Sequence, residues 1–510
     1  MPTYNEYLDQ FQEFGTVTEI RHPIVTLSGL PNARPDELII FENGDHGQIL
    51  ALNENTCDLL TFTNQPLTIG APATRTGKRL SINLSADLIG QVINPLGDVI
   101  DDSVGTNQST EERLVDSPPP SIAHRHQITQ SLTTGMSLVD LVLPLGQGQR
   151  ELIVGDQKTG KTTFALSVCK NQADTETIVI YAAIGKTQVE IQRLARFFRQ
   201  EDLSSRAVII ASSGADPLGL TFIAPFTAMT VAEYFRDQGE DVLLVLDDLT
   251  AHAHTHREIS LLARRFPGRD SYPGDIFHVH GRLLERAGSF RATGAGLPIN
   301  VVVKAKEGRA SSSITCLPIA VTQQNDLSDY IVSNLIGITD GHLLFDTTEF
   351  AQGHRPAINV NLSVTRVGKQ TQSHLLQEVN LKLMSLMTEL ERTQGFSHLA
   401  KELTSEVREK LNYGEYLYSF FNQPPDVRLP TNVQLVFFSM IWLKFFSGDP
   451  VTIHYYRDNL LRQYRDQTDV RELVDQITAT QSFDQLLKHT EAAKSKLMEL
   501  CQATNKPTKK

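Results

Sequence analysis

The sequence predicts a soluble, multidomain chain that starts with a small β-barrel, continues as an α/β domain and ends in an α-helical bundle. Three changes of pattern along the 510 residues indicate these parts. Short apolar runs separated by Gly and Asn come first. Apolar runs that alternate with helical patterns follow, and a glycine-poor stretch with 3.6-residue periodicity comes last. A chain of this length can bury more than one core.

The first part, residues 1–80, carries apolar runs at Ile24–Leu27, Leu38–Phe41 and Gln48–Leu52, with a turn at 42–47. Short strands at this spacing are typical of a small barrel. A short apolar stripe precedes them, and it is expected either to dock a partner helix or to cover the barrel. The stripe consists of Tyr4, Tyr7, Leu8, Phe11 and Phe14.

The second part, residues 81–371, contains the extended linker Ser117–Pro120, since each Pro fixes φ and removes a donor. Its later apolar runs are continuous, as expected for strands of a mostly parallel sheet that is covered on both faces. These runs are Leu152–Val154, Ile178–Tyr181, Val208–Ile210, Val242–Leu246 and Ile314–Leu317.

The third part, residues 372–510, shows the periodicity of amphipathic helices. One stripe consists of Leu376, Val379, Leu383, Leu386 and Leu390. No stretch reaches the roughly 18 apolar residues of a membrane span. The nearest is Leu435–Phe446, interrupted by Lys444, and it is expected to be a buried helix.

Composition excludes several classes of protein. The net charge of -12 argues against broad binding to nucleic acid or to anionic membranes. The four cysteines are far apart in sequence and are expected to be reduced and structural. The first residues lack the features of a signal or transit peptide, which favours a bacterial chain, with a plastid chain as the alternative.

A glycine-rich loop is the strongest functional signal. Gly155–Thr162 follows an apolar run and precedes a helical segment, the strand–loop–helix context of a phosphate-binding P-loop. Its backbone N–H groups and the helix N-terminus are expected to hold the phosphates of ATP or ADP. The nucleotide-binding residues predicted here are Gly155, Asp156, Gln157, Lys158, Thr159, Gly160, Lys161, Thr162 and Thr163.

An acidic residue at the end of a buried strand supports this interpretation. Asp247 follows the apolar run Val242–Leu246, and such a carboxylate can hold the hydration shell of Mg²⁺. The predicted metal site therefore consists of the Thr162 hydroxyl and, through water, Asp247. By itself the carboxylate is weak evidence, because strands often end in Asp as a turn residue.

The chain resembles the alpha subunit of F-type ATP synthases across nearly its whole length. The match lies in long stretches that occur in the same order. They are Thr134–Asp140, Pro144–Asp156, Asp247–Asp248, Ser260–Arg265, Pro267–Asp275, Arg282–Ala287, Ile338–Gly341, Arg355–Asn359 and Ser363–Gly368.

This resemblance implies a fold and an assembly. The central part would be a P-loop (RecA-like) nucleotide-binding domain in a subunit that alternates with beta subunits in a hexameric ring around a gamma shaft. A delta subunit or peripheral stalk would contact the ring, and the membrane sector would be coupled indirectly. No nucleic-acid partner is implied. The complex would lie at the cytoplasmic face of the bacterial inner membrane and couple proton or sodium-ion flow to ATP synthesis or hydrolysis.

The residue after Gly185 separates two roles within the family. Beta subunits carry a glutamate there that polarises the attacking water, whereas this chain has Lys186. A protonated lysine cannot accept a proton from water, so slow or absent hydrolysis is expected at this chain's own loop. If the register slipped, Glu190 would be the nearest acid, but it is expected in the following helix, pointing elsewhere.

The resemblance also implies residues outside the loop. Arg366, with Ser363 beside it, would reach the γ-phosphate of the neighbouring beta site as an arginine finger, a role that suits a planar, permanently charged group. Arg355, Pro356 and Gln423 would hold the nucleotide base. The second glutamine of the family pattern is Pro425 here, which puts base selectivity in doubt.

Other features fit less well. Residues 294–313 are longer than the family pattern and predict a surface β-hairpin. His252 and His256 share a helix face but lack a third ligand, so packed or solvated histidines are expected rather than a metal site. Two alternatives share the P-loop: a self-sufficient homohexameric ATPase motor, disfavoured by Lys186, and a nucleic-acid motor, disfavoured by the acidic charge.

Overall fold

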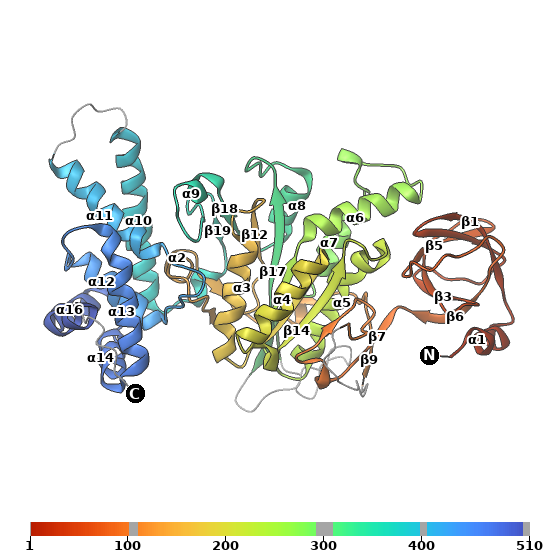
Figure 1. Cartoon of the computed structure of the whole chain (residues 1–510), viewed down its shortest axis with the longest axis horizontal. Coiled ribbons are helices and arrows are strands. Elements are labelled where there is room, and N and C mark those ends of the chain that lie inside the picture. The colour runs from red at the N-terminus through yellow and green to blue at the C-terminus, as the bar shows by residue number, and fades with distance from the viewer. Residues whose placement is uncertain (1, 101–110, 292–309, 398–404, 503–510) are drawn as a thin grey trace.

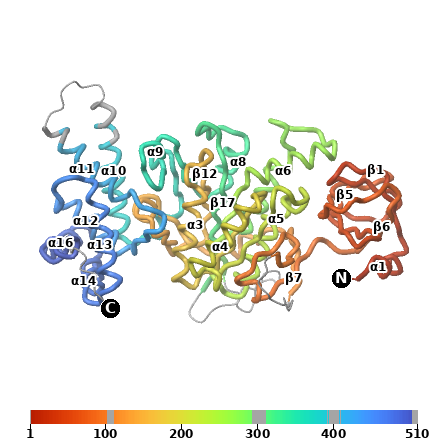
Figure 2. The backbone as a smooth tube through the Cα atoms, viewed as in Figure 1, coloured from red at the N-terminus to blue at the C-terminus, as the bar shows by residue number. Residues whose placement is uncertain are grey.

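The computed structural model describes residues 2–100, 111–291, 310–397 and 405–502. It contains an N-terminal barrel, a central α/β domain and a C-terminal helical domain, as the sequence predicts, with the barrel and the helices at opposite ends (Figures 1 and 2). The domain limits 80/81 and 371/372 stay predictions. The predicted hairpin at 294–313 lies largely outside the described residues.

Six antiparallel strands close the barrel in the order β1-β2-β5-β4-β3-β6. Its interior holds alternate residues of these strands, such as Val17, Leu27, Ile39 and Leu59. Helix α1 (Tyr4–Phe11) lies against β6 and buries Tyr7 on Ile40, so this part of the apolar stripe covers the barrel, whereas Phe14 is 61% exposed. The strands are β1 (Gly15–Arg21), β2 (Ile24–Ser28), β3 (Glu37–Phe41), β4 (His46–Leu52), β5 (Thr56–Thr61) and β6 (Pro72–Arg79).

A nine-stranded sheet forms the central domain, in the order β19-β18-β12-β17-β15-β13-β14-β8, with β16 paired to β17. Each predicted apolar run lies in one of its parallel strands. The strands are β8 (Val92–Ile93), β12 (Glu151–Asp156), β13 (Ile178–Lys186), β14 (Ala207–Ser213), β15 (Val242–Asp247), β16 (Gly288–Arg291), β17 (Ser311–Thr322), β18 (Gly341–Phe345) and β19 (Val364–Thr365). Short strands outside this sheet are β7 (Ser81–Leu84), β9 (Glu111–Leu114), β10 (Ser131–Leu132) and β11 (Leu145–Gly146).

Helices cover both faces of the sheet, because successive side chains of a strand point to opposite faces. In β13, Val179 and Tyr181 pack with α3 and α4, whereas Ile180 and Ala182 pack with α5. The helices are α2 (Ser137–Val142), α3 (Lys161–Asn171), α4 (Gln188–Gln200), α5 (Leu218–Asp237), α6 (Leu249–Leu262), α7 (Ile276–Leu284), α8 (Tyr330–Ile338) and α9 (Thr347–Ala351).

Helix α5 corrects one expectation of the sequence analysis. It is the one helix among the described residues that is long and apolar enough to cross a membrane, whereas the predicted nearest candidate was Leu435–Phe446. However, 89% of its 18-residue window is buried inside the domain. The buried helix predicted at Leu435–Phe446 is confirmed in part: α12 ends at Trp442, and Lys444 follows with a left-handed backbone.

The C-terminal domain is all-helical and shares one hydrophobic core with the α3 face of the sheet, from Phe164 through Val379 to Phe437. The predicted stripe lies on α10, where Val379, Leu383 and Leu390 are buried. The helices are α10 (His374–Ser397), α11 (Ser405–Phe421), α12 (Thr431–Trp442), α13 (Ile453–Asp466), α14 (Thr468–Thr478), α15 (Phe483–Ala492) and α16 (Lys494–Gln502). All four cysteines are buried free thiols.

A buried arginine connects the elements that pack on the α5 face of the sheet. Arg286 follows α7, is 0% exposed, and donates to Glu233 of α5 at 2.7 Å. It also donates to Thr230 Oγ1 at 2.7 Å and to the Val115 carbonyl oxygen at 2.9 Å. Burial alone would raise the pKa of Glu233, but Arg286 and neighbouring arginines outweigh burial and lower it.

Replacing this arginine tests its structural role. We expect Arg286→Met to lower the free energy of unfolding by about 3–5 kcal/mol, because a buried carboxylate loses its hydrogen-bonded partner and keeps only the more distant Arg236 at 3.8 Å. Urea-dependent pulse proteolysis of the purified chain measures the change. As a control, Arg282→Met removes a half-exposed ion pair with Asp116 and should cost at most about 1 kcal/mol. Equal effects of the two substitutions would contradict this role.

Candidate nucleotide-binding site

The glycine-rich loop connects β12 to α3, as the sequence predicts. Gly155 lies where a side chain could not fit, since a Cβ there would lie 2.2 Å from the Phe345 carbonyl oxygen. Gly160 and Lys158 adopt positive φ values of 100° and 64°, which curl the backbone ahead of α3. The N–H groups of the first turn of α3 therefore stand free at the loop, as an anion requires.

Lys161 lies under the loop. Its Nζ donates to the carbonyl oxygens of Gly155 at 2.8 Å and Asp156 at 2.5 Å. Burial lowers the pKa of Lys161 to about 8, although Asp248, Asp247 and Asp156 oppose this shift. The ammonium is thus held at the loop by hydrogen bonds to backbone carbonyl oxygens rather than to a carboxylate.

The Asp156 side chain has a structural partner rather than an open position. Its Oδ1 accepts from the Thr322 hydroxyl at 2.6 Å and from the Asn325 N–H at 2.9 Å. These bonds fix the segment after β17 beside the loop. A hollow of about 530 Å³ lies next to them and is lined by Asp156, Gln157 and Asp248, among others.

Asp247 is the centre of a hydrogen-bond network at the end of β15, and only 3% of it is exposed. Its Oδ2 accepts from the Thr162 hydroxyl at 3.0 Å and from the Tyr181 hydroxyl at 2.7 Å. The structure thus brings together the two predicted metal ligands, Thr162 and Asp247. Asp248 caps α6 by accepting from the Ala251 N–H at 2.7 Å.

Lys186 points into the same acidic pair. Its Nζ lies 2.7 Å from Asp247 Oδ1 and 3.1 Å from Asp248 Oδ2. Burial would lower the pKa of Lys186, but the two carboxylates outweigh burial and raise it. Glu190 caps α4 instead, accepting from the Thr187 N–H at 2.8 Å and its hydroxyl at 2.7 Å. No register slip therefore brings Glu190 to the site.

The donor chemistry fits Mg²⁺, since a hydroxyl and a carboxylate supply the hard oxygen atoms that this ion prefers. The charge of the pocket fits less well. Lys186 already neutralises part of the acidic pair, and its hydrogen bonds engage the second oxygen of Asp247. Thr162 and Asp247 would hold the ion, with an ammonium group as neighbour.

The predicted base-binding residues lie where the C-terminal domain meets the central one. Gln423 is 1% exposed, donates to the carbonyl oxygens of Gly135 and Val427 at 2.6 Å, and accepts from the Ser137 N–H. Arg355 stacks on Phe350, with 3.7 Å from its guanidinium carbon to the ring centroid. Arg355 and Pro356 line a small cavity of about 30 Å³, together with His354 and Tyr418, whose rings stack.

Arg366 lies at the opposite end of the sheet from the loop. Thr365 pairs with Gly341, and Gly341 pairs with Glu151 at the start of β12, whereas the loop begins after Asp156 at its end. At ~3.3 Å per residue, this separation is roughly 17 Å along the strand. Arg366 is exposed, and its charge partly offsets the rise that burial causes in the pKa of Glu151. It cannot reach the phosphates of its own loop.

Ser363, predicted beside Arg366, is bonded within the chain. Its hydroxyl donates to the Asn359 carbonyl oxygen at 2.6 Å and accepts from the Leu344 N–H at 3.0 Å. These bonds hold the turn that leads into β19. The catalytic role assigned to Ser363 stays a prediction.

Comparison with known proteins shows the family. The profile described as "ATP synthase alpha/beta family, nucleotide-binding domain" matches residues 135–365. "ATP synthase subunit alpha 3" of Paraburkholderia xenovorans is 39% identical over 411 residues, which cover 80% of this chain and 74% of the relative. The chain belongs to the ATP synthase alpha subunit family.

Two other relatives agree. "ATP synthase subunit alpha" of a Sulfurovum species is 36% identical over 425 residues, covering 83% of this chain and 81% of the relative. "ATP synthase subunit alpha 2" of Gluconobacter oxydans is 38% identical over 416 residues, covering 81% and 79%. The chain is therefore part of a membrane-associated ATP synthase complex and has a nucleotide-binding domain for ATP or ADP.

Sequence reasoning missed two participants of the site. Tyr181 was interpreted only as a strand residue, yet its hydroxyl holds Asp247. The strand alternation contained the signal, because Tyr181 and Ala183 share a face and Ala183 pairs with Asp247. The stacked pair of His354 and Tyr418 had no sequence signal, since the two residues come from different domains.

His252 and His256 of α6 are packed, as expected. His252 is 0% exposed, and its ring stacks on Phe222. A distance of 3.1 Å separates His252 Nδ1 from Nε2 of His280 on α7. His256 lies 3.5 Å from Asp275. No cluster of potential metal ligands occurs within the described part of the chain.

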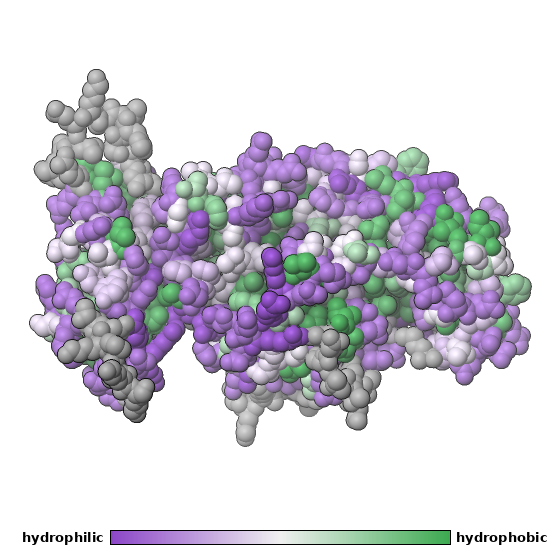
Figure 3. All heavy atoms as spheres, in the orientation of Figure 1, coloured by the Kyte–Doolittle hydropathy of each residue, from purple (hydrophilic) through white to green (hydrophobic). Residues whose placement is uncertain are grey.

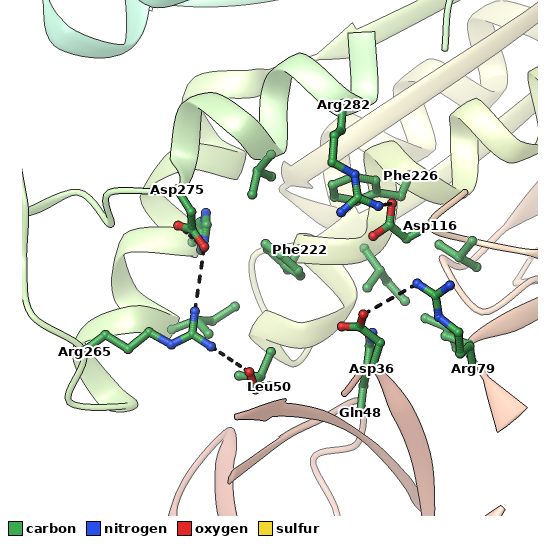
Figure 4. Close-up of a pocket in the computed structure, with 16 residues that line it drawn as sticks. Asp36, Gln48, Leu50, Arg79, Asp116, Phe222, Phe226, Arg265, Asp275 and Arg282 are labelled. Carbon is green, nitrogen blue, oxygen red and sulfur yellow. Dashed lines mark hydrogen bonds and ion pairs between the residues drawn. The ribbon is translucent and has the colours of Figure 1, made fainter. Parts of the chain in front are cut away.

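A separate hollow of about 230 Å³ lies between the barrel and the central domain (Figure 4). Its arginines already have carboxylate partners: Arg79 with Asp36, Arg282 with Asp116 and, more distantly, Arg265 with Asp275. Arg265 also donates to the Leu50 carbonyl oxygen at 2.9 Å. Each of these three ion pairs lies within one domain, and the bond from Arg265 to Leu50 joins the central domain to the barrel. The phosphate loop is the candidate site.

The buried histidines make stability depend on pH. Burial lowers the pKa of His280 to about 3, so the folded chain binds fewer protons than the unfolded chain below pH ~6.5. Stability is then lost as pH falls through this window. We expect His280→Gln to reduce the slope between pH 6 and 4 by up to ~1.4 kcal/mol per pH unit, measured by pulse proteolysis.

An exposed histidine of the same helix provides the control. His278→Gln should leave the slope unchanged, because His278 is exposed in the folded chain. If His280→Gln also left the slope unchanged, His280 would not be neutral in the folded chain.

Proposed function

We propose that this chain is the regulatory, non-hydrolysing alpha subunit of a rotary F-type ATP synthase. The observation that supports this role is the ammonium of Lys186 at the acidic pair of the phosphate site. Hydrolysis requires a group that orients the attacking water and accepts its proton. A protonated lysine cannot accept that proton. The site therefore binds ATP or ADP and retains it.

The second part of the proposal concerns Arg366. Its position at the end of the sheet opposite the loop and its exposure suit a group that acts on another subunit. As a finger in trans, Arg366 would place positive charge on the γ-phosphate of a neighbouring beta subunit. Such fingers contribute about 10³–10⁵ in turnover in related hydrolases.

The assembly follows from the same proposal. Alternating beta subunits, a gamma shaft and a delta subunit or peripheral stalk would surround this chain, on the cytoplasmic face of a bacterial inner membrane. The face seen in Figure 3 is largely hydrophilic, with apolar side chains in separate small patches. Phe266, in the segment after α6, is 98% exposed and suits such a subunit contact. Mg²⁺ would arrive with the nucleotide at Thr162 and Asp247.

Nucleotide retention without turnover is testable on the purified chain. We expect ATP to bind and stay intact, and Lys161→Ala to weaken binding by about 100-fold, because the loop loses its phosphate-directed ammonium. Calorimetric titration measures binding, and phosphate release measures turnover. Rapid hydrolysis by the pure chain, abolished by Lys161→Ala, would favour the self-sufficient homohexameric motor instead.

The arginine finger is tested in the assembled complex. We expect Arg366→Ala to lower steady-state ATPase activity by about 10³-fold while this chain still binds nucleotide, because the lost charge acts at the neighbouring site. Lys369→Ala removes an exposed cation three residues away and should keep turnover within about twofold. Full turnover by the Arg366→Ala complex would remove the finger from the proposal.

A further inference from the structure

Lys186 occupies a position in which it can do more than prevent hydrolysis. We propose that Lys186 supplies, at this phosphate site, the positive charge that a divalent metal ion otherwise supplies, so that the chain binds ATP or ADP without requiring Mg²⁺. This inference rests on the proposed function, because it assumes that the site retains a nucleotide. It assigns Lys186 a positive binding role and makes the metal dispensable for binding.

Asp247 already has several hydrogen-bond donors around its carboxylate. Both of its oxygens have partners inside the chain: Tyr181 and Thr162 on Oδ2, and Lys186 on Oδ1. Asp247 is 3% exposed, so few positions remain for water molecules that would bridge to a metal. The carboxylate that would attract the ion is thus already neutralised by a cation of the chain itself.

The backbone at Lys186 is held in place. It ends β13 after an irregularity in the register with β14 between Ala183 and Lys186. Gly185 has φ +64°, and its N–H donates to the Ser212 hydroxyl at 3.1 Å. The Lys186 carbonyl oxygen accepts from the Gly214 N–H at 3.0 Å. The backbone is therefore held on both sides of the lysine, and the side chain projects from a fixed point.

Lys186 also has a hydrogen-bond donor to spare. A lysine ammonium has three N–H donors. Two point to Asp247 and Asp248, which leaves one for a phosphate oxygen. The Lys186 side chain is 20% exposed, so this donor is open to a ligand. Lys161 provides a second ammonium at the same loop.

The charges favour the same conclusion. Two carboxylates and one ammonium leave one negative charge, whereas an acidic pair without Lys186 would carry two. A divalent ion would also approach the ammonium closely, and like charges repel in a partly buried site. The nucleotide phosphates, in contrast, are attracted by Lys186. The arrangement thus weakens metal binding and strengthens phosphate binding.

Calorimetric titration of the full chain with ATP tests this inference, once in excess EDTA and once in excess Mg²⁺. We expect the Kd of the wild-type chain to differ by less than about threefold between the two conditions. A loss of affinity of about tenfold or more in EDTA would overturn the inference. The wild-type comparison is decisive by itself and needs no variant.

Substitution of Lys186 gives a second measurement. We expect Lys186→Gln to weaken ATP binding by about tenfold or more in EDTA and to recover most of it in Mg²⁺, because the metal then enters an acidic pair without an ammonium. Lys186→Arg keeps the charge and should keep metal-independent binding. Electron paramagnetic resonance with Mn²⁺ should show tighter metal binding to Lys186→Gln with ATP than to the wild-type chain.

A matched control shows whether the effect is specific to Lys186 or follows from the removal of any lysine in the domain. Lys170→Gln removes a lysine of α3 that pairs with Glu201 at 2.7 Å, away from the phosphate end, and should behave as wild type. Binding of intact ATP only in Mg²⁺ would overturn this inference and leave the proposed function standing. Rapid turnover, or no binding in either condition, would overturn both.

Discussion

The buried carboxylate of Asp247 is the interaction on which the arrangement of the site depends. It lies at the carboxyl end of β15 and joins α3 through Thr162, β13 through Tyr181, and the end of β13 through Lys186. A charge with this little exposure is stable only when donors surround it. The same hydrogen bonds therefore fix the first turn of the helix that begins at the phosphate loop.

Lys186, beside the phosphate loop, and Arg366 lie at opposite ends of the strands of one sheet. The loop and Lys186 are at the carboxyl ends of the parallel strands, and Arg366 follows β19 near their amino ends. Because the sheet between them is rigid, the distance between its two ends does not depend on side-chain movements. One subunit can then present its phosphate loop at one end of the sheet and the exposed Arg366 at the other.

Much of this architecture could be predicted because the relevant signals are local. Continuous apolar runs such as Val242–Leu246 identify strands buried on both faces, and the glycine-rich loop identifies its own strand and helix. The partner of Tyr181, the direction of the Lys186 side chain and the ion pair of Arg286 join residues distant in sequence. Such contacts follow from strand order, which hydrophobic periodicity does not determine. The burial of α5 is a similar case, because apolar composition alone does not distinguish a core helix from a membrane span.

The hydrophobic core is divided unequally among the three parts of the chain. The barrel closes around a cluster of its own, and side chains such as Leu60 and Phe62 join the core of the second sheet face. The C-terminal helices instead share one continuous core with the α3 face of the sheet. A close-packed interior transmits displacement rather than absorbing it. The C-terminal helices are thus packed directly against the helix that follows the phosphate loop, so a displacement of those helices would reach the first turn of α3.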